Sequence, residues 1–206
     1  MQLDNFEVTI PEGRGIQGGY VELAHEQQYS IIITNRLGRK CDAELKVDGK
    51  HIETFQLHPY GSTSVLGPPD DPLKGRFTVY LPNTSEGHAA GVDQVNNLMR
   101  GLIEVTFRPE KVVVYNYSSS YPVASLGGDT MRSAYDAPQA KGGPSSASHQ
   151  SAGTGLSGQH NQKWQTVTAV DFDPNDVRTI TLRIVVPKSS GPRPLMSHST
   201  PVPPPV

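Results

Sequence analysis

Apolar and polar residues alternate along several short stretches of this chain. The clearest stretch is 179–186, where Ile180, Leu182, Ile184 and Val186 occupy every second position. A period of two residues is typical of a half-buried β-strand, because successive side chains of a strand point to opposite faces. The same alternation predicts five further strands, within 6–10, 29–33, 43–47, 77–81 and 103–107. Less regular patterns add candidate strands at 19–24, 52–57, 61–66, 112–116 and 164–170.

The helical signal is weak by comparison. Its best candidate is 92–99, where apolar residues at i, i+3, i+6 and i+7 predict a short connecting helix. Clusters of Gly, Pro, Asn and Asp separate the strands, and the crossover helices of a parallel sheet are missing from the pattern. The sequence therefore predicts an all-β fold, an antiparallel β-sandwich or jelly-roll-like domain of about 9 to 11 strands.

One hairpin can be predicted in more detail. Asp48-Gly49 is a strong hairpin signal between two apolar runs. A plain two-residue loop would point Phe55 to solvent, so we expect a three-residue loop or a bulge near Thr54. Either change of parity places Phe55 beside Ala43, and Leu57 beside Cys41. Cys41 is then a small core residue, an interpretation that we favour over a reactive thiol.

Composition changes beyond the first hundred residues. The range 117–162 is rich in Gly, Ser, Ala, Gln and Pro, which bury too little apolar area to offset the cost of ordering a backbone. Because the strong strand at 179–186 follows it, we expect 117–162 to be a long disordered-type loop insertion in one domain, 1–186. The range 187–206 is predicted to be a Pro-rich C-terminal tail with polyproline II character.

Charge, apolar run length and cysteine content indicate which partners and which cellular compartment to expect. A net charge of -2 gives no reason to expect nucleic acid as a partner. Apolar runs are too short for a transmembrane helix, so no membrane insertion is expected. The first residues lack the pattern of a signal peptide, and the single cysteine cannot form an internal disulfide. These features favour synthesis inside the cell, in a reducing compartment.

One acidic turn resembles a metal-binding loop. Asp171, Asp173, Asn175 and Asp176 place oxygen-bearing side chains at nearly alternate positions before the last strand. Hard cations such as calcium are bound by such oxygens, which makes these four residues the candidate metal ligands. The alternative is an Asp/Asn turn stabilised by hydrogen bonds from its own side chains to the backbone, and no resident cofactor is expected in that case. The seven histidines show no zinc-ligand spacing, and no nucleophile motif predicts catalytic residues.

Exposed aromatic residues are the candidates for contact with a partner or a glycan. Tyr115, Tyr117 and Tyr121 alternate with serines where the long loop opens, a composition typical of adaptable binding loops. Trp164 is the single tryptophan and follows the same loop. The alternative is that the tyrosines merely end a strand.

Three stretches carry a resemblance. An extended strand ending in Asn (29–35), a V-D-G hairpin (41–50) and an apolar strand before a Pro/Gly turn (55–62) together look like a sandwich module of uncharacterised proteins from large DNA viruses and protists. The resemblance covers about a third of the chain. It implies a β-sandwich and a structural or virion-associated role, and it transfers no catalytic residue.

The sequence therefore favours a non-enzymatic structural or interaction protein. Its loop and tail would contact neighbours in a homo-oligomer or larger protein assembly, because segments that cannot pack alone gain order on partner surfaces. A carbohydrate-binding module is the first alternative. An enzyme with a site assembled from loops, using Asp171, Asp173 or a histidine, is the second.

Overall fold

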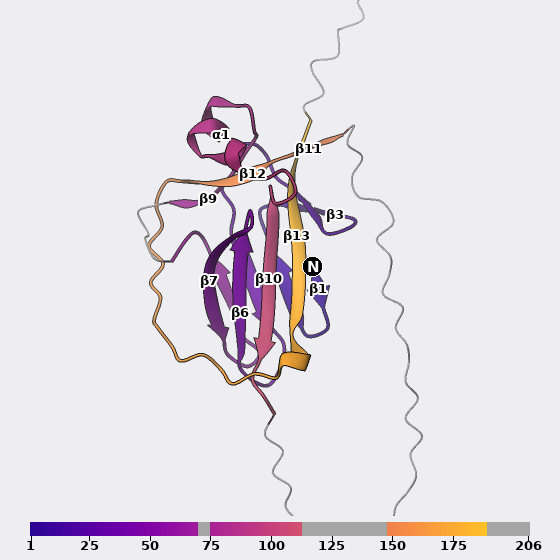
Figure 1. Cartoon of the computed structure of the whole chain (residues 1–206), viewed down its shortest axis with the longest axis vertical. Helices are drawn as coiled ribbons and strands as arrows, with labels where there is room; N and C mark the ends of the chain where they lie inside the picture. Colours follow the sequence, from indigo (N-terminus) through magenta and orange to yellow (C-terminus); the bar gives the residue numbers. More distant parts are fainter. Residues whose placement is uncertain (70–74, 113–147, 189–206) are drawn as a thin grey trace, which may run out of the picture.

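The chain folds mainly into strands. The computed structural model describes residues 1–69, 75–112 and 148–188, of which 47% lie in strands and 7% in helices. The fold is all-β, with antiparallel and mixed sheets (Figure 1). Tyr115, Tyr117, Tyr121 and nearly all of the Pro-rich tail lie outside the described residues, as does most of the strand expected at 112–116.

Two larger sheets make up the body of the molecule. The first is antiparallel, in the order β1 (Gln2–Leu3), β2 (Phe6–Thr9), β5 (Ile31–Asn35) and β8 (Ser62–Val65). The second has the order β3 (Arg14–Ile16), β4 (Tyr20–Glu22), β13 (Arg178–Pro187), β10 (Leu102–Pro109), β6 (Cys41–Val47) and β7 (Lys50–Leu57). Its β4–β13 pair is parallel, and β11 (His149–Ser151) pairs with the end of β13.

A small third sheet and three short helices complete the described elements. The sheet pairs β12 (Gly153–Ser157) with β9 (Arg76–Tyr80). The helices are α1 (Ser85–Ala89), the 3₁₀ turn η2 (Val92–Gln94) and the 3₁₀ turn η3 (Pro174–Asp176). None of the helices in the described part of the chain has the length and apolar character needed to cross a membrane.

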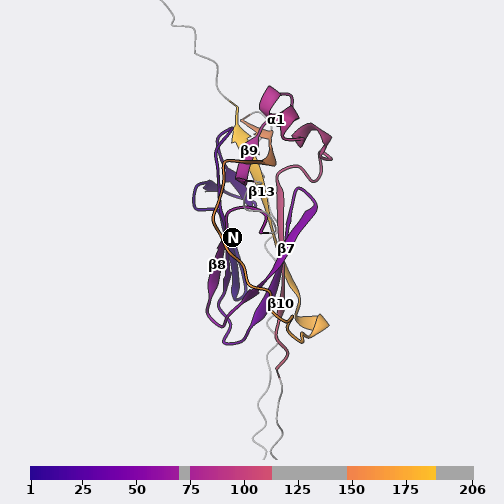
Figure 2. The ribbon, with the colours of Figure 1, turned by 90° about the vertical axis from the view of Figure 1, so that its left-hand side faces the viewer.

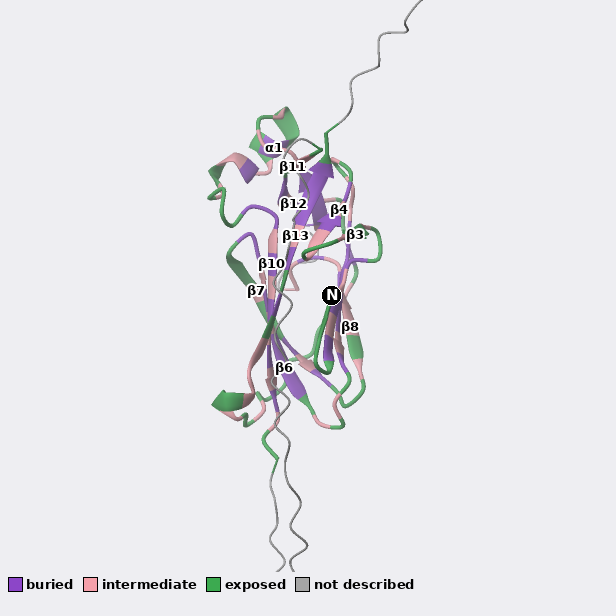
Figure 3. Cartoon of the chain, turned by 90° about the vertical axis from the view of Figure 1, so that its right-hand side faces the viewer, coloured by how far each residue is buried: buried purple, intermediate pink, exposed green. Residues whose placement is uncertain are grey.

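The core lies between the two larger sheets, which face each other in the view of Figure 2. Phe6 of the first sheet stacks on Phe107 of the second, with ring centroids 4.4 Å apart. The alternating apolar positions of the six clearest predicted strands are buried, except Leu81, which is partly buried, and Figure 3 shows the buried parts of the strands between the layers. All six of the clearest predicted strands are confirmed, and so are those at 19–24, 52–57 and 61–66.

The predicted bulge in the β6–β7 hairpin is present. Asp48 and Gly49 form a two-residue turn with φ of 52° and 75°, so the alternative three-residue loop is wrong. The register shifts opposite Leu45 and Lys46, where Ile52 is the extra residue, and this places Phe55 opposite Ala43 as expected. Cys41 lies opposite Leu57 with no exposed surface, and burial raises the pKa of its thiol to about 12.

Three sequence-based assignments are corrected by the structure. The stretch 164–170 is not a strand, and 92–99 is helical only in η2, while the α-helix forms earlier at Ser85–Ala89. Within the insertion predicted at 117–162, β11 and β12 are regular strands. Composition missed them because β11 is stabilised by pairing with β13, and the glycines of β12 fit where larger side chains would clash.

Candidate functional site

A long extended segment runs beside the β7 edge of the second sheet. This segment, 158–173, is called the strap below; it leaves β12 and ends at η3. Figure 1 shows it passing down the outer side of β7. Strand β7 is the last in its sheet and β8 is the last in the first sheet, so the strap follows the open edge between the two layers.

One end of the strap is fixed to β8 by a side-chain amide. Gln162 Nε2 donates to the carbonyl of Ser64 at 2.6 Å, and Gln162 Oε1 accepts from the amide of Leu66 at 2.8 Å. A neighbouring strand would bond to an edge strand through a similar pair of donor and acceptor groups. The Gln162 side chain therefore takes the place of a strand at this edge.

The other end is fixed to the second sheet. Gln56 of β7 donates from Nε2 to the Thr168 carbonyl at 2.8 Å. Asp42 of β6, which is 5% exposed, accepts from the amide of Val170 at 2.9 Å. The residues between these anchors cross the open edge without pairing to β7, which is why the strand predicted at 164–170 does not form.

A hollow of about 420 Å³ lies between the strap and the two edge strands. Its aromatic wall is Trp164, 38% exposed, which packs on Phe55 with ring centroids 4.8 Å apart. The remaining lining residues are polar or small and come from three segments: Glu53, Thr54, Gln56, Thr63, Pro69, Gln165, Thr166 and Val167. Trp164 thus belongs to a concave site, whereas the tyrosines grouped with it in the sequence lie outside the described residues.

The strand register shows which way two of these polar residues point. Side chains alternate along a strand, so Glu53 shares a face with buried Phe55. Thr63 lies opposite Ile33, which is fully buried, and cross-strand partners share a face. Glu53 and Thr63 are therefore polar residues on the inward faces of their strands. Glu53 stays exposed at the sheet edge, where its Oε1 accepts from the Thr54 amide at 2.9 Å; its Oε2 accepts from none of the described residues and is left for another partner.

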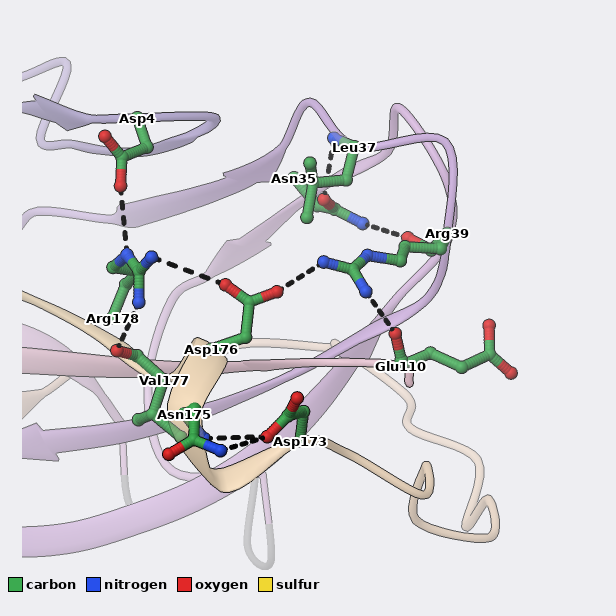
Figure 4. Close-up of polar contacts among 10 residues, drawn as sticks. All are labelled: Asp4, Asn35, Leu37, Arg39, Glu110, Asp173, Asn175, Asp176, Val177 and Arg178. Carbon is green, nitrogen blue, oxygen red and sulfur yellow. Dashed lines mark hydrogen bonds and ion pairs between the residues drawn. The ribbon is translucent and has the colours of Figure 1, made fainter. Parts of the chain in front are cut away.

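The acidic turn at 171–176 forms its own network (Figure 4). Asp173 Oδ1 accepts from the backbone amide of Asn175 at 2.9 Å and caps η3, as the alternative of an Asp/Asn turn expects. Asp176 pairs with Arg39 and, at 3.5 Å, with Arg178. Among the described residues, no three His, Cys, Asp or Glu groups gather as a metal site would require, and calcium binding here stays a prediction.

Asp48, in the turn just before β7, links three segments of the chain. Its carboxylate is 7% exposed and accepts from the amides of Gly101 and Thr154, each at 2.6 Å. Burial raises the pKa of Asp48 to about 6, in opposition to these two hydrogen bonds, which lower it. A second hollow of about 520 Å³ lies beside Asp48, between the start of β7, β12 and the end of α1.

A hydroxyl, an imidazole and a carboxylate line up between the start of β11 and the end of β4, two strands that both pair with β13. Ser148 Oγ lies 2.8 Å from His149 Nδ1, and His149 Nε2 lies 2.7 Å from Glu22 Oε2. The His149 and Arg14 hydrogen bonds hold the pKa of Glu22 below its usual range. Serine hydrolases also line up a hydroxyl, an imidazole and a carboxylate, but there the serine lies at Nε2 and the carboxylate at Nδ1, the reverse of the arrangement at His149. Sequence reasoning missed it because Glu22 and His149 are 127 positions apart, with no local signal.

Comparisons with models of protein families, with curated proteins and with solved structures found no match to this chain.

Proposed function

We propose that this chain is a non-enzymatic structural or interaction protein that acts in a protein assembly, on a β-sandwich or jelly-roll-like domain. The supporting observation is where the segment 113–147 is attached. The described chain breaks off at Val112, just beyond β10, and resumes at Ser148, just before β11. In Figure 1 these two points lie at opposite ends of the molecule.

Strand pairing gives the separation of the two attachment points. Phe107 near the first point pairs with Arg178, and His149 at the second pairs with Pro187. Arg178 and Pro187 are the two ends of β13, so Phe107 and His149 are roughly 30 Å apart at about 3.3 Å per residue, and Val112 lies five residues beyond Phe107. The chain from 113 to 147 could reach about 115 Å when extended. It is several times longer than its span requires, which leaves length for contact with a neighbouring molecule.

Association in solution tests this proposal. Light scattering over a range of concentrations should show oligomers, with amide exchange slowed in 113–147 and in the tail. In a matched variant, about 25 Gly/Ser residues replace 113–147, a flexible linker with a root-mean-square length of about 28 Å and an extended reach of about 80 Å, enough to cross the span. This variant should associate more weakly. A wild-type chain that stays monomeric, with both segments unprotected at every concentration, would refute the proposal. Incorporation into a virion is its narrower form, suggested by the resemblance.

Carbohydrate binding is the second candidate function. The observation that favours it is Trp164, a partly exposed aromatic ring held over a hollow by Phe55. Rings of this kind offer a flat apolar surface beside polar groups. A glycan array probed with the intact chain tests this candidate, and a blank array would remove it.

A further inference from the structure

We propose that the hollow between β7, β8 and the strap binds a neutral pyranose saccharide, with the Trp164 ring against the apolar face of one sugar ring. This proposal rests on the second candidate function and assigns its site and ligand class. It is independent of the assembly proposal.

The lining groups suit the hydroxyls of a sugar. Each sugar hydroxyl donates one hydrogen bond and accepts others, so it needs both kinds of partner. Thr63 can act as donor or acceptor, Gln165 offers both an amide donor and a carbonyl acceptor, and Glu53 offers a carboxylate acceptor. Two of these groups face inward from β7 and β8, and the third comes from the strap. Polar groups from three segments therefore converge on one space.

The aromatic wall suits the other surface of a sugar. A pyranose ring has a face of C–H groups, which gains from contact with an aromatic ring that is otherwise exposed to water. Trp164 offers such a ring and is held by Phe55 on one side. Stacking and hydrogen bonding can thus act on the same ligand.

Charge favours a neutral ligand. Glu53 is the one ionisable residue among the described residues that line the hollow. A carboxylate repels anionic ligands such as uronic acids, and the part of the lining that the structure describes contains no cation to compensate for it. Neutral sugars are not repelled by the Glu53 carboxylate. The volume of about 420 Å³ falls in the range of small-molecule sites.

The site is formed before a ligand arrives. Gln162 fixes the strap to β8 on one side of Trp164, and Gln56 with Asp42 fixes it on the other. Ordering a loop on binding would cost affinity, and these anchors reduce that cost.

Trp164 also supplies the assay, because it is the single tryptophan of the chain. The probes are cellohexaose, maltohexaose, chitohexaose and xylohexaose, with hexagalacturonate as the acidic comparison. We expect at least one neutral probe to shift the tryptophan emission in a saturable manner and hexagalacturonate to have no effect. If no neutral hexasaccharide binds, this proposal fails; the second candidate function fails as well if the glycan array is blank, and the assembly proposal stands in either case.

Variants locate the site by calorimetry. Trp164→Ala and Glu53→Gln should each weaken binding about tenfold or more. Phe172→Leu is the control, because Phe172 is an exposed aromatic residue of the same strap that does not line the hollow; it should bind as the wild type does. If a variant unfolds, as judged by circular dichroism, Thr63→Val is the substitute. If both Trp164→Ala and Glu53→Gln bind saccharide as the wild type does, the proposed site is wrong, and the carbohydrate must bind to another surface.

Discussion

The pH dependence of stability should reveal how the buried carboxylate of Asp48 is balanced. The pKa of Asp48 is about 6 in the folded chain, because burial raises it from the usual 3.8 of an aspartate. A raised carboxyl pKa means that the folded state binds the proton more tightly than the unfolded state does. The stabilisation is therefore fully present below about pH 4 and is lost as pH rises through 6. The shift of about two pH units corresponds to about 3 kcal/mol at most.

The variant Asp48→Asn isolates this effect. An asparagine tolerates the left-handed backbone of the turn but does not titrate. Its side-chain NH₂ group would face one of the two backbone N–H donors, which lowers the free energy of unfolding by about 1–3 kcal/mol. This loss does not change with pH. Urea unfolding followed by circular dichroism at pH 4.5, 5.5, 6.5 and 7.5 gives the free energy of unfolding of both proteins. We expect the wild type to lose stability relative to Asp48→Asn as pH rises, by about 2 kcal/mol across this range.

Asp4 provides the matched control. Its φ of 51° is close to the 52° of Asp48, but Asp4 is exposed and pairs with Arg178 at the surface. Asp4→Asn should leave the pH profile of the wild type nearly unchanged, because exposed ion pairs contribute little. Parallel curves for the wild type and Asp48→Asn would refute the reasoning. A wild type that becomes more stable relative to Asp48→Asn as pH rises would also refute it, because the hydrogen bonds from the Gly101 and Thr154 amides would then affect the pKa more than burial does.

Three further outcomes follow from the structure. The Cys41 thiol should resist iodoacetamide in the native chain and react fully in urea, because it is buried with a pKa of about 12; native labelling would contradict its place in the core. Gln162→Leu should lower the free energy of unfolding by about 1–2 kcal/mol and speed amide exchange at Leu66, while Gln165→Leu leaves that amide protected. A fluorophosphonate probe should leave Ser148 unlabelled if the protein is non-enzymatic, and labelling that depends on His149 would overturn that assignment.

The fold could be predicted where burial imposes a period on the sequence. Strands β5, β6, β10 and β13 have one face in the core, so their apolar residues alternate. Strand β12 shows no such alternation. A Cβ on Gly155 would lie 2.7 Å from the Tyr80 ring, so close packing, and not apolar content, selects the glycine. Interpreting this stretch as low-complexity sequence could not reveal that steric constraint.

The strand predicted at 164–170, within the strap, is wrong for the opposite reason. Its Thr and Val residues have the composition of a strand, but such preferences reflect packing on a pleated surface. Here the anchoring is done by the side chains of Gln162, Gln56 and Asp42, and their partners are 98, 112 and 128 positions away. Trp164 could be singled out by its residue type. The inward direction of Glu53 and Thr63 could not, because it depends on the register after the Ile52 bulge and on pairing with β5.

An exposed sheet edge presents unpaired backbone groups, and proteins usually cover or charge such edges to prevent pairing with other chains. At the β7–β8 edge a paired strand would cover those groups but would fill the space between the layers. The strap crosses the edge on side-chain anchors instead, so the edge is covered while the hollow beside Trp164 stays open. In the second sheet, β7 is one edge, and β4, whose Glu22 contacts His149, lies toward the other. The proposed saccharide site therefore lies at the opposite end of the strand order from the contact beside Ser148, where the described chain resumes. For this reason Trp164→Ala should weaken saccharide binding about tenfold or more without altering the oligomeric state, and the linker variant should weaken association without altering saccharide binding.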